Sequence, residues 1–233
     1  MHIKRLVVCL VLLTVGLTSA WAQRAEVMLT LPGGNKYFGT TKNGEPDGKG
    51  IETSDNGHKY IGEFKSGKWN GQGIYTTPDG GTLEGLWKNG VANGKGKEIS
   101  PNKFIYEGEY KDGNFNGAGK LILPGGQVLE GEFRDGKMNG PGSVTRSDGS
   151  KFIGDFKNGK PNSHGTLVTK SGETYTGGIE NGKMSGVGTY TWPSRGTYTG
   201  EFANNLPNGK GVFTSITGKV QAGTFKDGEF VEK

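Results

Sequence analysis

The sequence is poor in the residues from which redox, metal and most catalytic sites are built. It has one cysteine, Cys9, and three histidines among 233 residues. Because Cys9 lies within the first 22 residues, the rest of the chain offers no thiolate for a disulfide, a redox pair or a zinc site. Around His58 and His164 no acid–base pair, activated nucleophile or ligand cluster is recognisable. We therefore expect a protein that is not an enzyme and that holds no metal or cofactor.

Long apolar runs are also absent, apart from one at the N-terminus. This run, residues 6–17, follows two basic residues and precedes the small-x-small sequence Ala20-Trp21-Ala22. It is shorter than the ~20 residues that a membrane-spanning helix needs. We predict a cleavable signal peptide over residues 1–22, cut between Ala22 and Gln23, with an uncleaved anchor as the alternative. The expected destination is the periplasm or the cell exterior, with a peripheral membrane position left open.

The excess of positive charge is small. The 28 basic and 23 acidic residues give a formal net charge of +5, which falls to +3 when the two basic residues of the predicted signal peptide are removed. General binding to nucleic acid needs a much stronger clustering of lysine and arginine. We therefore expect no nucleic-acid partner.

Glycine, by contrast, is abundant and periodic. It accounts for 45 residues, and nine of them recur every 23 residues. With Tyr37 as position one of the first unit, this series stands at position three, and two further glycine series stand at positions eight and fourteen. A fixed period of this length indicates one supersecondary unit copied along the chain. The series at position three is Gly39, Gly62, Gly85, Gly108, Gly131, Gly154, Gly177, Gly200 and Gly223.

Each unit has the sequence pattern of a β-hairpin. Aromatic residues at positions one and five flank the glycine in Tyr60-Ile61-Gly62-Glu63-Phe64, so that alternate side chains share one face of a strand. Turn pairs such as Asn158-Gly159 follow at positions seven and eight. A second short strand is expected near position sixteen. We predict an all-β fold, a single-layer elongated array of β-hairpins. A half-repeat cap covers 23–36, eight 23-residue units cover 37–220, and a partial repeat or cap covers 221–233.

This glycine–aromatic pattern resembles the MORN repeat, the membrane occupation and recognition nexus motif. The resemblance covers the chain from about residue 27 to its end and is clear in Tyr198-Thr199-Gly200-Glu201-Phe202. Departures are local, since Thr41 and Ile179 replace the aromatic residue at position five and Ser163 replaces a glycine. The resemblance implies a sheet of hairpins that serves as a scaffold, a dimerisation element or a membrane-associated module.

The aromatic residues form the first candidate contact surface. Most of them are expected to pack against one another, because side chains that alternate toward one face usually build the core. Trp69 and Phe115, both at position ten beside a turn, are less easily buried by their own hairpin and are the better contact candidates. The whole candidate aromatic face is Tyr60, Phe64, Trp69, Trp87, Tyr106, Tyr110, Phe115, Phe133, Phe152 and Phe156.

A basic row at position six forms the second candidate surface. It runs beside an acidic row at position four, which consists of Glu63, Glu109, Glu132, Asp155 and Glu201. One interpretation is a solvated face with glutamate–lysine pairs, and the other is a site for anionic lipid or envelope polymers. The basic row is Lys65, Lys88, Lys111, Arg134 and Lys157.

These observations favour an exported, non-catalytic scaffold of the cell envelope that binds another protein or itself, a homodimer being one form. The first alternative is peripheral binding to anionic lipid or envelope polymers through the basic row, which salt would weaken. The second alternative is a glycan-binding groove that uses stacked aromatic rings and depends on Trp69 or Trp87. The sequence leaves the partner, the oligomeric state and the choice among these functions open.

Overall fold

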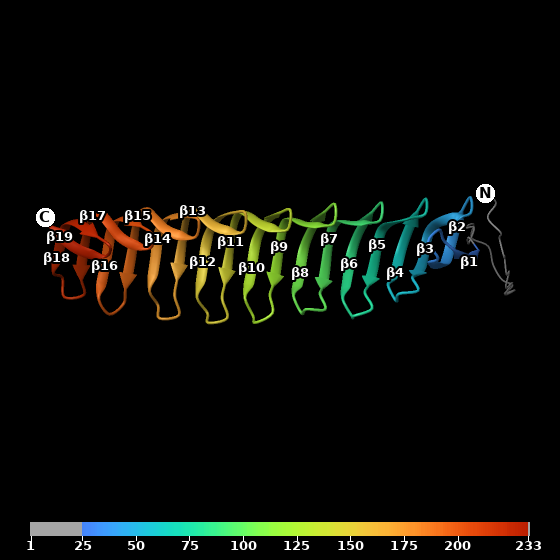
Figure 1. Ribbon diagram of the computed structural model, residues 1–233, viewed down its shortest axis with the longest axis horizontal. Helices are drawn as coiled ribbons and strands as arrows, with labels where there is room; N and C mark the ends of the chain where they lie inside the picture. Colours follow the sequence, from blue (N-terminus) through green and yellow to red (C-terminus); the bar gives the residue numbers. More distant parts are fainter. Residues whose placement is uncertain (1–24, 233) are drawn as a thin grey trace, which may run out of the picture. The chain divides into compact units, whose positions relative to one another are not determined.

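The computed structural model describes residues 25–232, which form strands joined by turns and contain no helix (Figure 1). The all-β hairpin fold expected from the period is therefore confirmed for this part of the chain. Among these residues there is no helix long and apolar enough to cross a membrane. The predicted signal peptide and its cleavage point between Ala22 and Gln23 lie outside the described residues.

The described residues contain 19 strands, and neighbouring strands within each unit pair in antiparallel fashion. The strands are β1 (Glu26–Thr30), β2 (Lys36–Lys42), β3 (Glu45–Thr53), β4 (Lys59–Lys65), β5 (Lys68–Thr76), β6 (Thr82–Lys88), β7 (Val91–Ile99), β8 (Ile105–Lys111), β9 (Asn114–Ile122), β10 (Val128–Arg134), β11 (Lys137–Thr145), β12 (Lys151–Lys157), β13 (Lys160–Val168), β14 (Thr174–Glu180), β15 (Lys183–Trp192), β16 (Gly196–Ala203), β17 (Leu206–Ser215), β18 (Val220–Lys226) and β19 (Glu229–Glu232).

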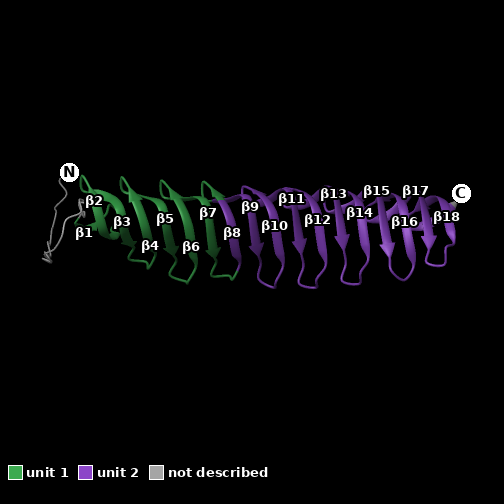
Figure 2. Ribbon diagram, turned by 180° about the vertical axis from the view of Figure 1, so that it is seen from behind, with its two compact units in different colours: residues 1–103, 110–113 green, residues 104–109, 114–233 purple. Residues whose placement is uncertain are grey.

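The chain divides into two compact units, which Figure 2 draws in two colours. Unit 1 holds strands β1 to β7 together with Tyr110–Gly113. Unit 2 holds Phe104–Glu109 and the chain from Asn114 onward. Within each unit, consecutive strands pair with one another, so the strands follow one another in chain order as a meander.

Tight turns connect the two strands of each repeat, as the asparagine–glycine and aspartate–glycine pairs predict. In the first repeat Asn43 and Gly44 have φ angles of 54° and 83°, and in the sixth Asn158 and Gly159 have 51° and 80°. Both residues of a type I′ turn need a positive φ, which asparagine and glycine tolerate better than other residues. Asn205, which replaces the glycine in the eighth repeat, also adopts a positive φ, of 74°.

The second strand of each repeat is longer than the sequence suggested. In the second repeat it starts at Lys68, directly after the turn, and not near position sixteen. The register shifts between the pairs Gly62–Gly73 and Phe64–Trp69, so that residues 70–72 lie opposite Glu63 alone. This β-bulge bends the strand and hides the alternation of side chains on which the sequence prediction depended.

The core lies on one face of the strands and is built around the residue at position one. Tyr60 is fully buried, and its hydroxyl donates a hydrogen bond to the carbonyl oxygen of Glu63 at 3.2 Å. Its ring fills the space over Gly62 and Gly73, and a Cβ added to Gly62 would lie 2.6 Å from the tyrosine hydroxyl. Tyr106 makes the same bond to the carbonyl of Glu109 at 2.9 Å. The recurring glycines therefore make room for the buried rings.

Candidate functional site

The structure places most of the predicted aromatic face in the core. Eight of its ten members are less than a tenth exposed and so present little surface to a partner, namely Tyr60, Phe64, Trp87, Tyr106, Tyr110, Phe133, Phe152 and Phe156. The other two, Trp69 and Phe115, are half-buried. Their rings lie flat on the tyrosine at position one of their own repeat. Trp69 stacks on Tyr60 at a centroid distance of 4.3 Å, and Phe115 stacks on Tyr106 at 3.7 Å.

A hollow of about 280 Å³ lies beside Trp69 in unit 1. We call it the Trp69 hollow. Its members come from the three strands β3 to β5 and from two turns of the first repeats, and they combine aromatic rings with hydrogen-bonding side chains. They are Asn35, Glu52, Ser54, Asn56, His58, Lys59, Tyr60, Trp69 and Tyr75.

Hydrogen bonds hold the polar wall of the Trp69 hollow in place. Glu52 accepts a bond from Nδ2 of Asn35 at 2.6 Å and a second from Nε1 of Trp69 at 2.8 Å. The hydroxyl of Tyr75 lies 2.5 Å from Nδ1 of His58, and the two rings are parallel to within 7° at 5.7 Å. Burial, followed by the charge of Asp79, raises the pKa of Tyr75, so its hydroxyl stays neutral at ordinary pH.

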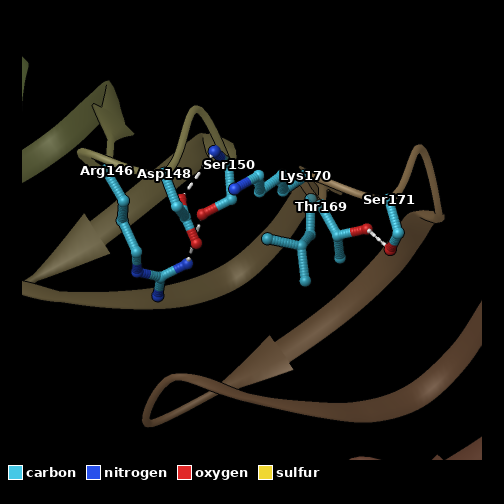
Figure 3. Close-up of a pocket in the computed structure, with 7 residues that line it drawn as sticks. Arg146, Asp148, Ser150, Thr169, Lys170 and Ser171 are labelled. Carbon is cyan, nitrogen blue, oxygen red and sulfur yellow. Dashed lines mark hydrogen bonds between the residues drawn. The ribbon is translucent and has the colours of Figure 1, made fainter.

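A second hollow, of about 600 Å³, lies between two turns of unit 2 (Figure 3). Nη1 of Arg146 donates to Oγ of Ser150 at 3.3 Å, and the backbone N–H of Ser150 donates to Oδ1 of Asp148 at 2.8 Å. The hydrogen bonds from Ser150, helped by the charges of Arg146 and Lys170, lower the pKa of Asp148. Because this carboxylate offsets the neighbouring cations, the hollow is a poor match for an anion.

The predicted basic row is exposed in both units at Lys65, Lys88, Lys111, Arg134 and Lys157. The acidic row beside it is exposed as well. In the second repeat the carboxyl group of Glu63 lies over Gly71, where an added Cβ would touch it, and Glu109 covers Gly117 in the same way. The acidic side chains therefore lie along the strands on the face that carries the lysines, where they offset much of the positive potential.

The same outer face of unit 1, turned away from the core, carries a surface that the sequence analysis missed. Five apolar residues are cross-strand partners on β1 to β5, and together they form what we call the outer apolar row. Four of them have exposures of 72%, 44%, 43% and 40%, for Met28, Phe38, Ile61 and Ile74 in that order, and the fifth, Ile51, is half-buried. Residues at positions two and fifteen alternate with core residues along their strands, so the sequence could have predicted that their side chains point away from the core. Only the strand register shows that they form one row.

The corresponding positions of the later strands are polar or isolated. In unit 1 the row continues with Glu84 opposite Lys97. In unit 2 it contains threonine pairs such as Thr166 and Thr176, whose hydroxyls lie 3.1 Å apart. These threonines separate the two exposed large apolar residues of the row, Ile153 and Val212. Over residues 25–232, no group of three or more histidine, cysteine, aspartate or glutamate side chains could hold a metal ion.

Comparison with solved structures finds folds that are similar only at a low level. A mutant of the TCP10 domain of CPAP from Danio rerio has 15% identity and a TM-score of 0.41, over 83% of this chain and 96% of that chain. The SAS-4 (dCPAP) TCP domain of Drosophila melanogaster, in complex with a proline-rich motif of Ana2 (dSTIL), has 12% identity and a TM-score of 0.42, over 82% and 99%. Similarity of this degree carries no argument about function. No curated protein matches the sequence.

A protein-family model, by contrast, matches most of the chain. The MORN repeat model matches eight consecutive segments, which agree with the 23-residue period and with the hairpins of the structure. The segments are residues 37–59, 60–82, 84–103, 106–128, 130–151, 152–174, 175–197 and 198–220. The chain therefore belongs to the MORN repeat family.

Proposed function

We propose that this chain is a non-catalytic scaffold that binds another protein through the outer apolar row of unit 1. Membership of a family of binding repeats supports a scaffold in general. The single observation that carries the proposal is the exposed row itself, which extends in register over five neighbouring strands. Isolated exposed apolar residues are common on protein surfaces, but a contiguous apolar row is typical of an interaction site.

The charges beside the row indicate the chemistry of the partner. Lys36 and Lys59 flank it on one side, both paired with Thr53. Lys49 and Glu63, which pair with each other, flank it on the other side. All of these charged residues are exposed. Glu26, exposed on β1 and paired with Thr40, borders the row beside Met28, so three lysines and two glutamates surround it. This excess of lysine suits an amphipathic segment whose apolar face is bordered mainly by carboxylates.

The same charges favour a distinct partner over a second copy of this chain. Two identical faces packed against each other would bring two lysine-rich borders together, and like charges at an interface cost affinity. Self-association is therefore the competing outcome of the test. Binding to anionic lipid through the basic row has weaker support, because the exposed acidic row lies on the same face.

The proposal includes export to the cell envelope. It rests on the sequence of residues 1–22 alone, where a basic start, an apolar run and Ala20-Trp21-Ala22 follow one another. N-terminal sequencing of the protein recovered from the periplasm or the medium should give a chain that begins at Gln23. Recovery of the chain with residues 1–22 intact would contradict the predicted cleavage.

Two matched substitutions test the docking surface. Ile61→Glu places a charge in the outer apolar row, and Ile153→Glu makes the same change at position two of a unit 2 strand, at a residue of similar exposure. A photo-crosslinking amino acid at position 38 captures the partner in cells, and the partner is then purified and titrated against each variant. We expect Ile61→Glu to weaken its binding by about tenfold or more, which corresponds to about 1.4 kcal/mol, and Ile153→Glu to leave it unchanged.

Equal affinity of the wild type and the Ile61→Glu variant for the captured protein would contradict the proposal. So would sedimentation of the wild type as a dimer that Ile61→Glu dissociates, because the row would then be a self-association surface. Thermal unfolding of both variants checks that each glutamate is tolerated by the fold, as expected for exposed positions.

A further inference from the structure

The Trp69 hollow is the place where the repeat pattern is broken most strongly. Tryptophan occurs at position ten only in the second repeat, where the other described repeats have proline, alanine, phenylalanine or methionine. Glu52 at position sixteen of the first repeat and Asn35, 17 residues before it, coincide with this tryptophan at only one place among the described repeats. Because other repeats fold without this combination, folding does not require it. These three residues are therefore candidates for binding a ligand.

The wall of the hollow has hydrogen-bonding capacity beyond the bonds within the protein. A carboxylate offers about four acceptor sites, and Glu52 uses one for Asn35 and one for Trp69. The Asn35 side chain keeps its carbonyl oxygen and a second N–H, and His58 keeps Nε2. The hollow therefore presents donors and acceptors side by side, next to the half-buried rings of Trp69 and Tyr75.

The charges of the hollow favour a neutral ligand. The Glu52 carboxylate on the wall disfavours an anion, and hydrogen bonds from Asn35 and Trp69 already offset part of its charge. A cation held between two rings is also a poor match. Trp69 lies parallel to Tyr60 at 4.3 Å, and its centroid is only 5.3 Å from that of Tyr75, which leaves no room between the rings.

Among neutral ligands, a sugar ring fits better than a proline-rich peptide. Proline has no N–H to donate to Glu52, and the indole N–H that could donate to a peptide carbonyl is already bonded to Glu52. A pyranose has an apolar face of C–H groups for an aromatic ring, and it has hydroxyl groups that both donate and accept. Those groups complement the mixed donors and acceptors of Asn35, Glu52 and His58.

We propose that the Trp69 hollow binds a neutral sugar ring of a glycan. The apolar face of the sugar lies against the Trp69 indole, and its hydroxyl groups bond to Glu52, Asn35 and His58. Glu52 also positions Trp69 through the 2.8 Å bond to its Nε1. This site is independent of the proposed docking surface, because Tyr60 faces the hollow and its neighbour Ile61 points to the other side of the sheet.

Calorimetric titration of the exported chain with cellotetraose, chitotetraose and maltotetraose tests the proposal. We expect at least one of these neutral sugars to bind, with an affinity that added salt does not change, because no net charge is paired. Trp69→Phe is compatible with the fold, since phenylalanine stands at position ten in another repeat. It removes the bond to Glu52 and should weaken binding by about tenfold. Glu52→Gln, which keeps an acceptor for Trp69, should weaken it less.

Phe115→Ala is the matched control, because Phe115 is the equivalent half-buried ring of unit 2 and lies outside the hollow. It should leave sugar binding unchanged, as should Ile61→Glu. Absence of binding to all three sugars, or equal binding by the wild type and the Trp69→Phe variant, would overturn the proposal. If a polyproline peptide binds in a way that depends on Trp69 and no sugar binds, the hollow is a peptide site and the proposal is wrong. None of these results bears on the docking surface, which has its own variants.

Discussion

At the scale of single residues, the fold depends on where side chains are absent and where φ is positive. Tyr60 occupies the space of two missing side chains, at Gly62 and Gly73. In the fifth repeat, where leucine stands at position one, the buried side chain of Met138 fills the space next to Gly142 instead. Different residues can therefore fill this space, provided that the glycines remain.

Ser163 is a residue whose replacement should stabilise the protein. It stands at position twelve, where most repeats have glycine, and its φ is 70°. A non-glycine residue in this left-handed region costs roughly 1–2 kcal/mol. We expect Ser163→Gly to raise the free energy of unfolding by about 1 kcal/mol, measured by denaturant titration. Ser185→Gly, at a position without a positive φ, should lower it. Equal effects of the two changes would contradict this account.

The buried tyrosines should make the protein sensitive to alkali. Burial raises the pKa of Tyr37, Tyr106 and Tyr175 from 10.0 to about 12. Because their folded pKa lies above the unfolded value, their stabilisation is complete below pH 10.0 and is lost as the pH rises toward about 12. Tyrosinate absorbance should therefore appear together with the loss of the circular dichroism of the strands. Ionisation near pH 10 without unfolding would show that these hydroxyls are accessible.

At the scale of the element, each hairpin is tied to the next by its backbone as well as by its rings. The N–H at position eight donates to the carbonyl at position ten of the preceding repeat, as in Gly67 to Pro46 and Gly159 to Met138, both at 2.9 Å. This bond is local to two neighbouring repeats. Stability in such arrays is close to a sum of terms from each repeat and its neighbours.

Gly131→Val should therefore loosen one hairpin more than the others. A Cβ at Gly131 would lie 2.5 Å from the backbone of Pro141 and Gly142, so β10 and β11 cannot keep their separation. Overpacking of this kind costs roughly 1–3 kcal/mol. Hydrogen exchange should become faster in residues 128–145 and remain slow in β16 and β17. The prediction is wrong if exchange in β10 and β11 does not change, or if all strands of unit 2 exchange faster to the same degree.

At the scale of the whole molecule, the surface chemistry is uneven while the fold repeats. The apolar row is confined to unit 1, and the matching positions of unit 2 are mostly threonine and other polar residues. The rows at positions four and six, however, alternate acid and base in both units. A repeat fold thus separates the residues that build the sheet from those that are free to carry a binding surface.

This charge pattern predicts weak attraction to anionic membranes. At about 0.15 M salt, where the Debye length is ≈ 8 Å, a chain of residues 23–233 should not sediment with phosphatidylserine vesicles. A variant with Glu63, Glu109 and Glu132 changed to glutamine should bind them, because three of the carboxylates beside the basic row are then neutral. If the wild type does bind the vesicles, and this binding weakens as salt rises, the basic row from Lys65 to Lys157 is a functional site.

The repeat, its hairpins and the family could be predicted from the sequence because glycine spacing, turn pairs and side-chain alternation are local properties of the chain. The burial of most aromatic residues was predicted for the same reason, and so was the greater exposure of Trp69 and Phe115. The length of the second strand was not, since a bulge depends on cross-strand pairing. The outer apolar row and the contacts of Glu52 with Asn35 and Trp69 also needed the structure, because they join residues of different repeats. Only strand register decides which of these residues become neighbours.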